Sequence, residues 1–116
     1  MTTTAVSPSP YADQLTYALW LTEEAYARGL TIGLKNTPDM VADALPYYDF
    51  SVLEDCFYYT WCADLLPFIE AVKPVFAIEY TDMHVDFDAA CMEAGSLGLT
   101  MILKHRNLDA FRQACP

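Results

Sequence analysis

Charged and polar side chains stand directly after four short apolar segments of this 116-residue sequence. In chain order these strand-end groups are Lys35-Asn36, Glu54-Asp55, Glu79-Tyr80 and Lys104-His105-Arg106. If the apolar segments are parallel strands, their carboxyl ends meet at one edge of a sheet, where functional side chains collect. Two carboxylates and two lysines would then converge. Carboxylates on neighbouring strand ends suit cleavage of a glycosidic bond, which requires one acid and one base or nucleophile.

Aromatic residues stand close to these carboxylates in the sequence, namely Tyr58, Tyr59, Trp61 and Tyr80. Flat aromatic faces at a cleft can stack on sugar rings, but aromatic side chains also serve as core and rim packing. The charged residues have a purely structural alternative as well. In it Glu54 pairs with Lys35, and Glu79 pairs with Lys104, as ion pairs of the rim.

The elements that would position these residues alternate between helix and strand. The predicted strands are Leu30–Leu34, Phe50–Leu53, Pro74–Ile78 and Leu99–Leu103. The predicted helices are Asp13–Arg28, Thr37–Leu45, Cys62–Ala71, Asp86–Ala94 and Leu108–Ala114.

This alternation predicts an α/β fold of parallel βαβ units with four strands. A closed (β/α)8 barrel needs eight strands and about 250 residues. The chain is therefore predicted to be either a small complete α/β sandwich or half of such a barrel.

The composition is typical of one folded domain, with 54% apolar and 19% charged residues. Residues 1–10 are rich in Thr, Ser and Pro and predict a flexible leader, and residues 11–116 predict the domain. No apolar stretch is long enough for a transmembrane helix. The first ten residues have neither a basic start nor an apolar stretch, so we expect no secretory signal in them.

The charge balance is strongly acidic, with 16 acidic and 6 basic side chains and a net charge of −10. Binding of nucleic acid through its phosphates is therefore not expected. The long-range field favours a cationic partner or substrate instead. Gly29 and Gly33 do not form a phosphate-cradling loop, and we expect no cofactor.

The four cysteines allow three disulfide connectivities. The economical one pairs Cys56 with Cys62 and Cys91 with Cys115. The alternative is four reduced, partly buried thiols. None of the cysteines forms a CxxC pair and the two histidines are far apart in the sequence, so we expect no structural zinc or other metal site.

The strand ends also carry an ordered set of motifs. Residues Gly33–Asn36 read GLKN, Glu54–Phe57 read EDCF, and Ile78–Tyr80 read IEY. Further segments agree with them in order and spacing: Asp13–Leu15, Glu24–Leu30, Pro67–Ile69, Lys73–Phe76, Leu103–Lys104 and Leu108–Asp109. From about residue 11 to residue 115 this set resembles the glycoside hydrolase family 114 domain, the TIM-barrel endo-α-1,4-polygalactosaminidases.

The resemblance covers the family's C-terminal half, its last four βα units. It implies that Glu54 is one of two catalytic carboxylates. Lys35, Asn36 and Glu79 would line the same cleft, and Tyr80 and Lys104 of the same rim are predicted to bind substrate with them. The family's other proposed carboxylate belongs to a DNxD-type motif at an earlier strand end, and this motif is absent from the sequence.

The resemblance also implies a substrate class and a location. The family acts on a partly deacetylated galactosamine polymer, which is cationic and suits a net charge of −10; a neutral polysaccharide is the other expected partner. Family members tend to be secreted, which implies an extracellular location and favours disulfides. With only one carboxylate, the chain is expected to hydrolyse its substrate weakly or not at all.

A half barrel would expose two sheet edges and an apolar concave face. A second copy could cover them as a homodimer that closes an eight-stranded barrel. The alternative function is a non-catalytic carbohydrate-binding α/β module.

Overall fold

A computed structural model describes residues 10–116 of the chain, so the predicted leader lies outside the described residues except for Pro10. In chain order the elements are α1 (Tyr11–Ala27), β1 (Gly33–Lys35), η1 (Pro38–Met40), α2 (Val41–Ala44), β2 (Phe50–Glu54), η2 (Cys62–Leu65), α3 (Leu66–Glu70), β3 (Val75–Tyr80), η3 (Thr81–Met83), α4 (Phe87–Leu97), β4 (Thr100–Lys104) and β5 (Gln113–Ala114). The three η elements are short 3-10 helices. All four predicted strands are present, with ends displaced by a few residues.

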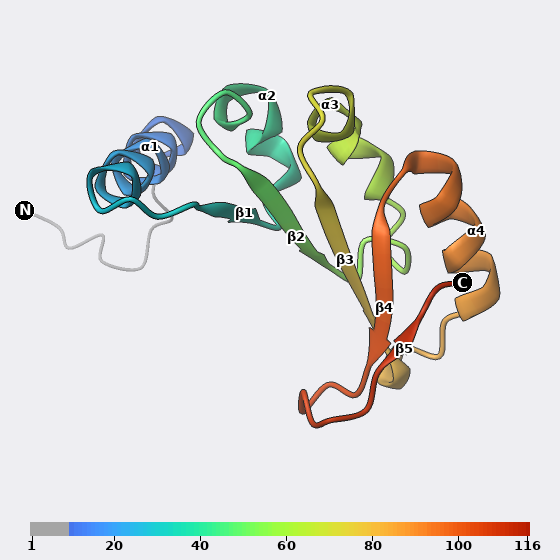
Figure 1. Cartoon of the computed structure of the whole chain (residues 1–116). Coiled ribbons are helices and arrows are strands. Elements are labelled where there is room, and N and C mark those ends of the chain that lie inside the picture. The colour runs from blue at the N-terminus through green and yellow to red at the C-terminus, as the bar shows by residue number, and fades with distance from the viewer. Residues whose placement is uncertain (1–9) are drawn as a thin grey trace, which may run out of the picture.

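The strands of residues 10–116 form one sheet in the order β1-β2-β3-β4-β5. The first four strands are parallel to one another, and β5 runs antiparallel to β4. In Figure 1 the four helices lie on one face of this curved sheet and follow its curve. This arrangement confirms the predicted α/β fold of parallel βαβ units. No helix in the described part is long and apolar enough to cross a membrane.

The core lies between the helices and the sheet. On β2 and β3 the buried side chains alternate with half-buried or exposed ones, as the period of a strand requires. Leu53, Val75 and Ala77 face the helices and are buried against Leu65 and Phe68. This layer fixes which side chains of each strand point toward the helices and which point to the opposite face.

The opposite, concave face of the sheet is apolar and largely uncovered by the described residues. Phe76 is 41% exposed there and meets Phe50 edge to face, with ring centroids 6.1 Å apart. The Phe50 ring lies over Gly33, where a Cβ would come within 2.2 Å of it. Any larger residue at position 33 would therefore displace Phe50 from this face.

The predicted helix Leu108–Ala114 is wrong. Leu108 has a left-handed φ of 58°, and the Asn107 and Asp109 side chains accept hydrogen bonds from the backbone N–H groups of Asp109 and Phe111. Such local side-chain bonds compete with helix formation.

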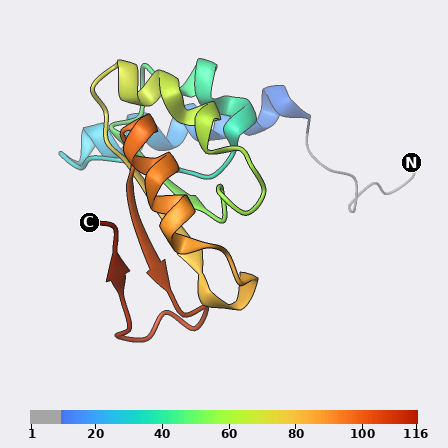
Figure 2. The same ribbon diagram turned by 90° about the vertical axis from the view of Figure 1, so that its right-hand side faces the viewer.

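The chain instead turns back after β4 and forms β5, whose Gln113 and Ala114 pair with Leu103 and Ile102. Figure 2 shows β5 returning beside β4 in the opposite direction. A disulfide between Cys91 of α4 and Cys115 fixes this end of the chain. The sheet therefore has five strands in the described residues, one more than predicted.

Candidate functional site

The parallel register brings the predicted rim residues to one edge of the sheet. Lys35, Glu54, Tyr80 and Lys104 are the last residues of β1, β2, β3 and β4. Tyr80 is the register partner of Lys104. Because all four strands point the same way, their carboxyl ends meet at this rim, as expected for an α/β fold.

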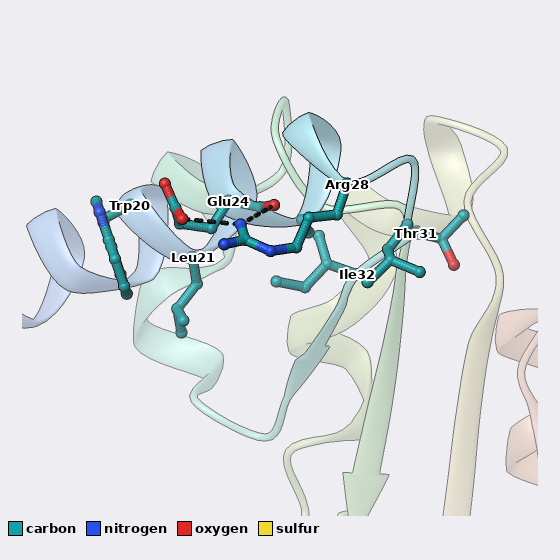
Figure 3. A pocket seen from close by; sticks show the side chains of 8 residues that line it. Trp20, Leu21, Glu24, Arg28, Thr31 and Ile32 are labelled. Carbon is teal, nitrogen blue, oxygen red and sulfur yellow. Dashed lines mark hydrogen bonds and ion pairs between the residues drawn. The ribbon is translucent and has the colours of Figure 1, made fainter.

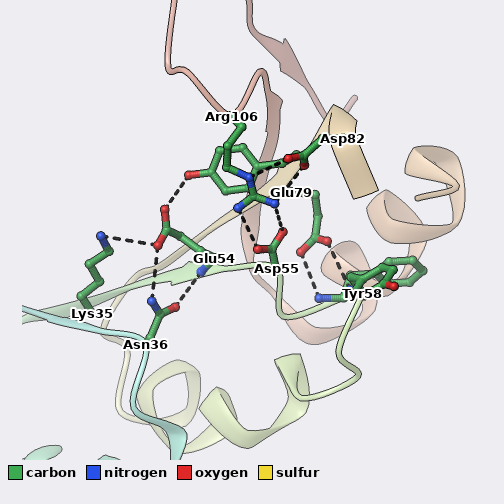
Figure 4. Close-up of polar contacts among 10 residues, drawn as sticks. Lys35, Asn36, Glu54, Asp55, Tyr58, Glu79, Asp82 and Arg106 are labelled. Atoms are coloured by element: carbon green, nitrogen blue, oxygen red, sulfur yellow. Dashed lines mark hydrogen bonds and ion pairs between the residues drawn. The ribbon is translucent and has the colours of Figure 1, made fainter. Parts of the chain in front are cut away.

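Glu54 is at the centre of the polar contacts at the rim (Figure 4). Its Oε2 accepts a hydrogen bond of 2.5 Å from the Tyr80 hydroxyl. Its Oε1 lies 3.4 Å from Nζ of Lys35 and 3.5 Å from Nδ2 of Asn36. The side chain is 29% exposed. Glu54 is thus a partly accessible carboxylate with three donors around it and an open side toward solvent.

The same contacts shift the pKa values of Glu54 and Tyr80. The hydrogen bond from Tyr80 and the nearby Lys35 ammonium lower the pKa of Glu54 below its ordinary value, against the opposing effect of burial. Burial and the Glu54 carboxylate raise the pKa of Tyr80 to about 12. Tyr80 therefore stays protonated and donates, while Glu54 stays ionised at neutral pH.

Asn36 holds Glu54 through both groups of its side-chain amide. Its Oδ1 accepts the backbone N–H of Glu54 at 2.7 Å, and its Nδ2 donates to the Glu54 carboxylate. Asn36 has φ 56°, in the left-handed region that Asn occupies more readily than most residues. The chain can therefore turn at the end of β1 and direct this amide toward β2.

Arg106 was not predicted as a site residue, but it bridges three of the strand ends. Its guanidinium lies 3.8 Å from the Tyr80 ring centroid. Its nitrogen atoms donate to Asp55 at 3.0 and 3.4 Å and to Asp82 at 2.9 and 3.0 Å. The hydrogen bond from Arg106 lowers the pKa of Asp82. The signal in the sequence was the position of Arg106 and Asp82, each two residues beyond the end of a strand.

Glu79 was predicted to line the cleft, but the structure places it on the other face of β3. It is adjacent to Tyr80, and successive strand residues point to opposite faces. Glu79 is fully buried, and its two oxygens accept the backbone N–H groups of Phe57 and Tyr58 at 3.0 and 3.2 Å. Burial raises the pKa of its carboxyl. Glu79 therefore holds the loop after β2 and is not open to a substrate at the rim.

The two structural ion pairs considered from the sequence have different outcomes. The pair of Lys35 with Glu54 is present. The pair of Glu79 with Lys104 is wrong, because Nζ of Lys104 donates to the backbone oxygen of Asp109 at 2.5 Å. Lys104 thus anchors the turn after β4, next to the register partner Tyr80.

The aromatic residues near the carboxylates divide into exposed and buried ones. Tyr58 and Tyr59 are exposed in the loop after β2 and meet edge to face, with ring centroids 4.8 Å apart. Tyr80 is only 1% exposed. The disulfide Cys56–Cys62 closes the same loop and is buried. The structure contains both bonds of the economical cysteine pairing.

A separate pocket of about 410 Å³ lies between α1 and the segment that enters β1 (Figure 3). Trp20, Leu21 and Ile32 line it, together with the ion pair of Glu24 and Arg28. It is at the amino end of β1, whereas Glu54 is at the carboxyl end of β2. Within residues 10–116 no group of three or more His, Cys, Asp or Glu side chains could hold a metal ion.

Comparisons with known proteins agree with this geometry. The sequence profile of glycoside-hydrolase family GH114 matches residues 7–116. Among solved structures, the crystal structure of Aspergillus fumigatus Ega3 in complex with galactosamine is similar, with a TM-score of 0.83 and 31% sequence identity. The match covers 92% of this chain and 47% of that chain. No curated protein sequence matches the chain significantly.

The chain thus spans about half the length of the Ega3 chain, and its curved sheet with outer helices matches a partial TIM barrel. The family match covers nearly all residues of this chain, including every strand end of the rim. The chain belongs to glycoside-hydrolase family GH114.

Proposed function

We propose that the chain carries one catalytic carboxylate of a glycoside hydrolase that acts on α-1,4-linked galactosamine polymers, and that Glu54 is this residue. The observation that carries the proposal is the placement of Glu54 at the rim, partly exposed and held by donors from β1 and β3. An ionised carboxylate is the form required of a base or nucleophile. Lys35 and Asn36 are proposed to bind substrate beside it.

The electrostatics support a cationic substrate. The net charge of −10 on the whole chain attracts a polymer with free amino groups. At the rim itself Glu54 is paired with Lys35, and Asp55 and Asp82 are paired with Arg106, so the attraction comes from the chain as a whole. The galactosamine bound to Ega3 is a sugar of this kind. We propose that the chain acts on this polymer outside the cell.

A second carboxylate is required for efficient hydrolysis. Asp55 and Asp82 are paired with Arg106, and Glu79 is buried. None of these three can act across a bond from Glu54 without leaving its present partners. We therefore expect the chain alone to release few or no reducing ends.

The decisive experiment supplies the missing group from solution. The chain is incubated with partly deacetylated α-1,4-galactosamine polymer, with and without sodium formate, and reducing ends are measured. Formate is a small carboxylate that can enter the open concave side. We expect formate to increase release by the native chain and to have no effect on Glu54→Gln. Equal release of reducing ends by the two proteins in the presence of formate would contradict the role of Glu54.

The alternative function is a non-catalytic carbohydrate-binding module, which the exposed Tyr58 and Tyr59 beside the rim favour. In that case the same polymer binds without hydrolysis in any condition. Its binding weakens with added salt, as expected for exposed charges, and survives Glu54→Gln. Titration calorimetry at two salt concentrations on both proteins separates the two functions.

A second copy is the proposed partner for the open concave face. Closing an eight-stranded barrel from two copies requires β1 of one copy to pair with β4 of the other. In the present structure β5 already pairs with Ile102 and Leu103 of β4, so this pairing would require β5 to move. We expect light scattering over a concentration series to show a dimer. Phe76→Asp should raise the concentration that is needed to form it. A monomer at every concentration would contradict the proposal.

A further inference from the structure

Arg106 connects the loops that follow three different strands. It stands two residues after β4 and bonds Asp55, which follows β2, and Asp82, which follows β3. The Asp55 side chain is 12% exposed and the Asp82 side chain 51% exposed. The two carboxylates therefore hold the guanidinium from two directions and fix its plane, in the forked geometry that suits Arg.

The guanidinium plane of Arg106, held by Asp55 and Asp82, lies over the Tyr80 ring. The guanidinium carbon is 3.8 Å from the ring centroid, which is within the range of a cation–π contact. The hydroxyl of the same ring donates to Oε2 of Glu54. Figure 4 shows Arg106 between Asp55 and Asp82. A chain of direct contacts thus runs from Arg106 through Tyr80 to Glu54.

We propose that Arg106 is a positioning residue for Glu54: held by Asp55 and Asp82, it covers the Tyr80 ring and keeps the Tyr80 hydroxyl on the Glu54 carboxylate. This inference rests on the proposed function for the importance of Glu54, but the contacts themselves do not depend on it.

The hydrogen bonds of Arg106 favour this role over direct substrate binding. Nε, Nη1 and Nη2 all donate to carboxylates of the chain. A lysine at this position would supply a point charge, but it could not bond both aspartates in one plane and stack on the ring. The proposal therefore requires the shape of Arg106 and not only its charge.

The test measures the Glu54 carboxyl directly in the full chain and uses no sugar. The chain is labelled with ¹³C-glutamate and titrated by NMR, and the Glu54 signal is assigned by its loss in Glu54→Gln. The titrated proteins are the native chain, Arg106→Ala, Tyr80→Phe and the double variant. Arg28→Ala is the matched control, because Arg28 pairs with Glu24 at the other end of the sheet.

We expect Arg106→Ala to raise the titration midpoint of Glu54, because a mobile Tyr80 donates to the carboxylate less often. We expect no further rise when Arg106→Ala is added to Tyr80→Phe, since the route through the hydroxyl is already absent. Arg28→Ala should leave the midpoint unchanged. An equal rise in both backgrounds would show a direct charge effect and overturn the proposal, as would the absence of any rise.

Arg106→Lys keeps the positive charge and decides the matter if Arg106→Ala does not fold. A rise of the midpoint with Arg106→Lys in the native background, and none in the Tyr80→Phe background, supports positioning. A midpoint equal to that of the native chain shows that charge alone is sufficient and overturns it. Because no outcome depends on hydrolysis or sugar binding, failure of the proposed function cannot be confused with failure of this inference.

Discussion

The hydroxyl of Tyr80 donates a hydrogen bond of 2.5 Å to Oε2 of Glu54 and joins the last residues of β3 and β2. The phenol is almost fully buried, and its pKa is raised to about 12. It therefore remains a donor over the whole physiological pH range. Together with Lys35 and Asn36, the bond holds the Glu54 carboxylate in place, and it lowers the pKa of that carboxyl.

Tyr80→Phe is expected to destabilise the chain in a pH-dependent way. The pKa of Glu54 is lowered in the folded state, so its ionised form contributes stability above the unfolded value near 4.5, and this is lost as the pH falls through the folded value. Removing a hydrogen bond to a charged group costs about 2 kcal/mol at neutral pH. Urea unfolding from neutral to acid pH should show that the difference in free energy of unfolding between the native chain and Tyr80→Phe shrinks as the pH falls. A difference that stays constant with pH would contradict the assignment.

Asn36→Ala is expected to cost more stability than Asn36→Gly. Both variants lose the two hydrogen bonds to Glu54. Only alanine also places a Cβ in the left-handed conformation, which costs roughly 1 kcal/mol. Urea unfolding of both variants therefore separates the conformational effect of residue 36 from its hydrogen bonds. Equal stability of the two variants would show that the backbone relaxes at this turn.

Glu79→Ala is expected to loosen the loop after β2. The variant leaves the N–H groups of Phe57 and Tyr58 without their buried acceptor, at a cost of about 2 kcal/mol. Hydrogen exchange of these two amides should accelerate. Glu70→Ala is the matched control, since Glu70 is exposed at the end of α3 and most surface substitutions change stability by less than about 0.5 kcal/mol. Unchanged exchange at Phe57 and Tyr58 would contradict the contact.

The two disulfides are expected to contribute unequally to the free energy of unfolding. Residues Cys91 and Cys115 are 24 apart in the sequence, and Cys56 and Cys62 are 6 apart. By restricting the unfolded chain, the disulfide of the longer loop stabilises the folded state by about 3.5 kcal/mol and that of the shorter loop by about 2.3 kcal/mol. Replacing each pair by alanines and measuring urea unfolding tests this order. Peptide mapping without reductant checks the pairing itself, and any mixed pairing would contradict it.

The sequence alone predicted the alternation of helices and strands, since short apolar runs and the residues that end helices are local signals. It also placed Lys35, Glu54 and Tyr80 at the same rim, because parallel strands end at one edge of a sheet. The family resemblance came from the same strand-end segments. These predictions depend on local residue order and were confirmed for the fold.

Only the tertiary structure decided which strand-end residues share a face. Glu79 and Tyr80 are neighbours in the sequence, yet the strand period directs one into the core and the other toward Glu54. A shift of one residue in register is enough to reverse this assignment. Because Val75–Ile78 is apolar at every position, the sequence does not show which of its residues face the helices.

The long-range pairing of charges was likewise decided by the tertiary structure. Arg106 lies 51 residues from Asp55 in the sequence, and the parallel pairing of β2 and β4 on either side of β3 brings the two loops to the same edge of the sheet. β5 replaced the predicted last helix for a similar reason, because Cys115 bonds to Cys91 and the local turns favour a return along β4. The sequence by itself determined the elements and the rim, and their packing determined which rim residues contact Glu54.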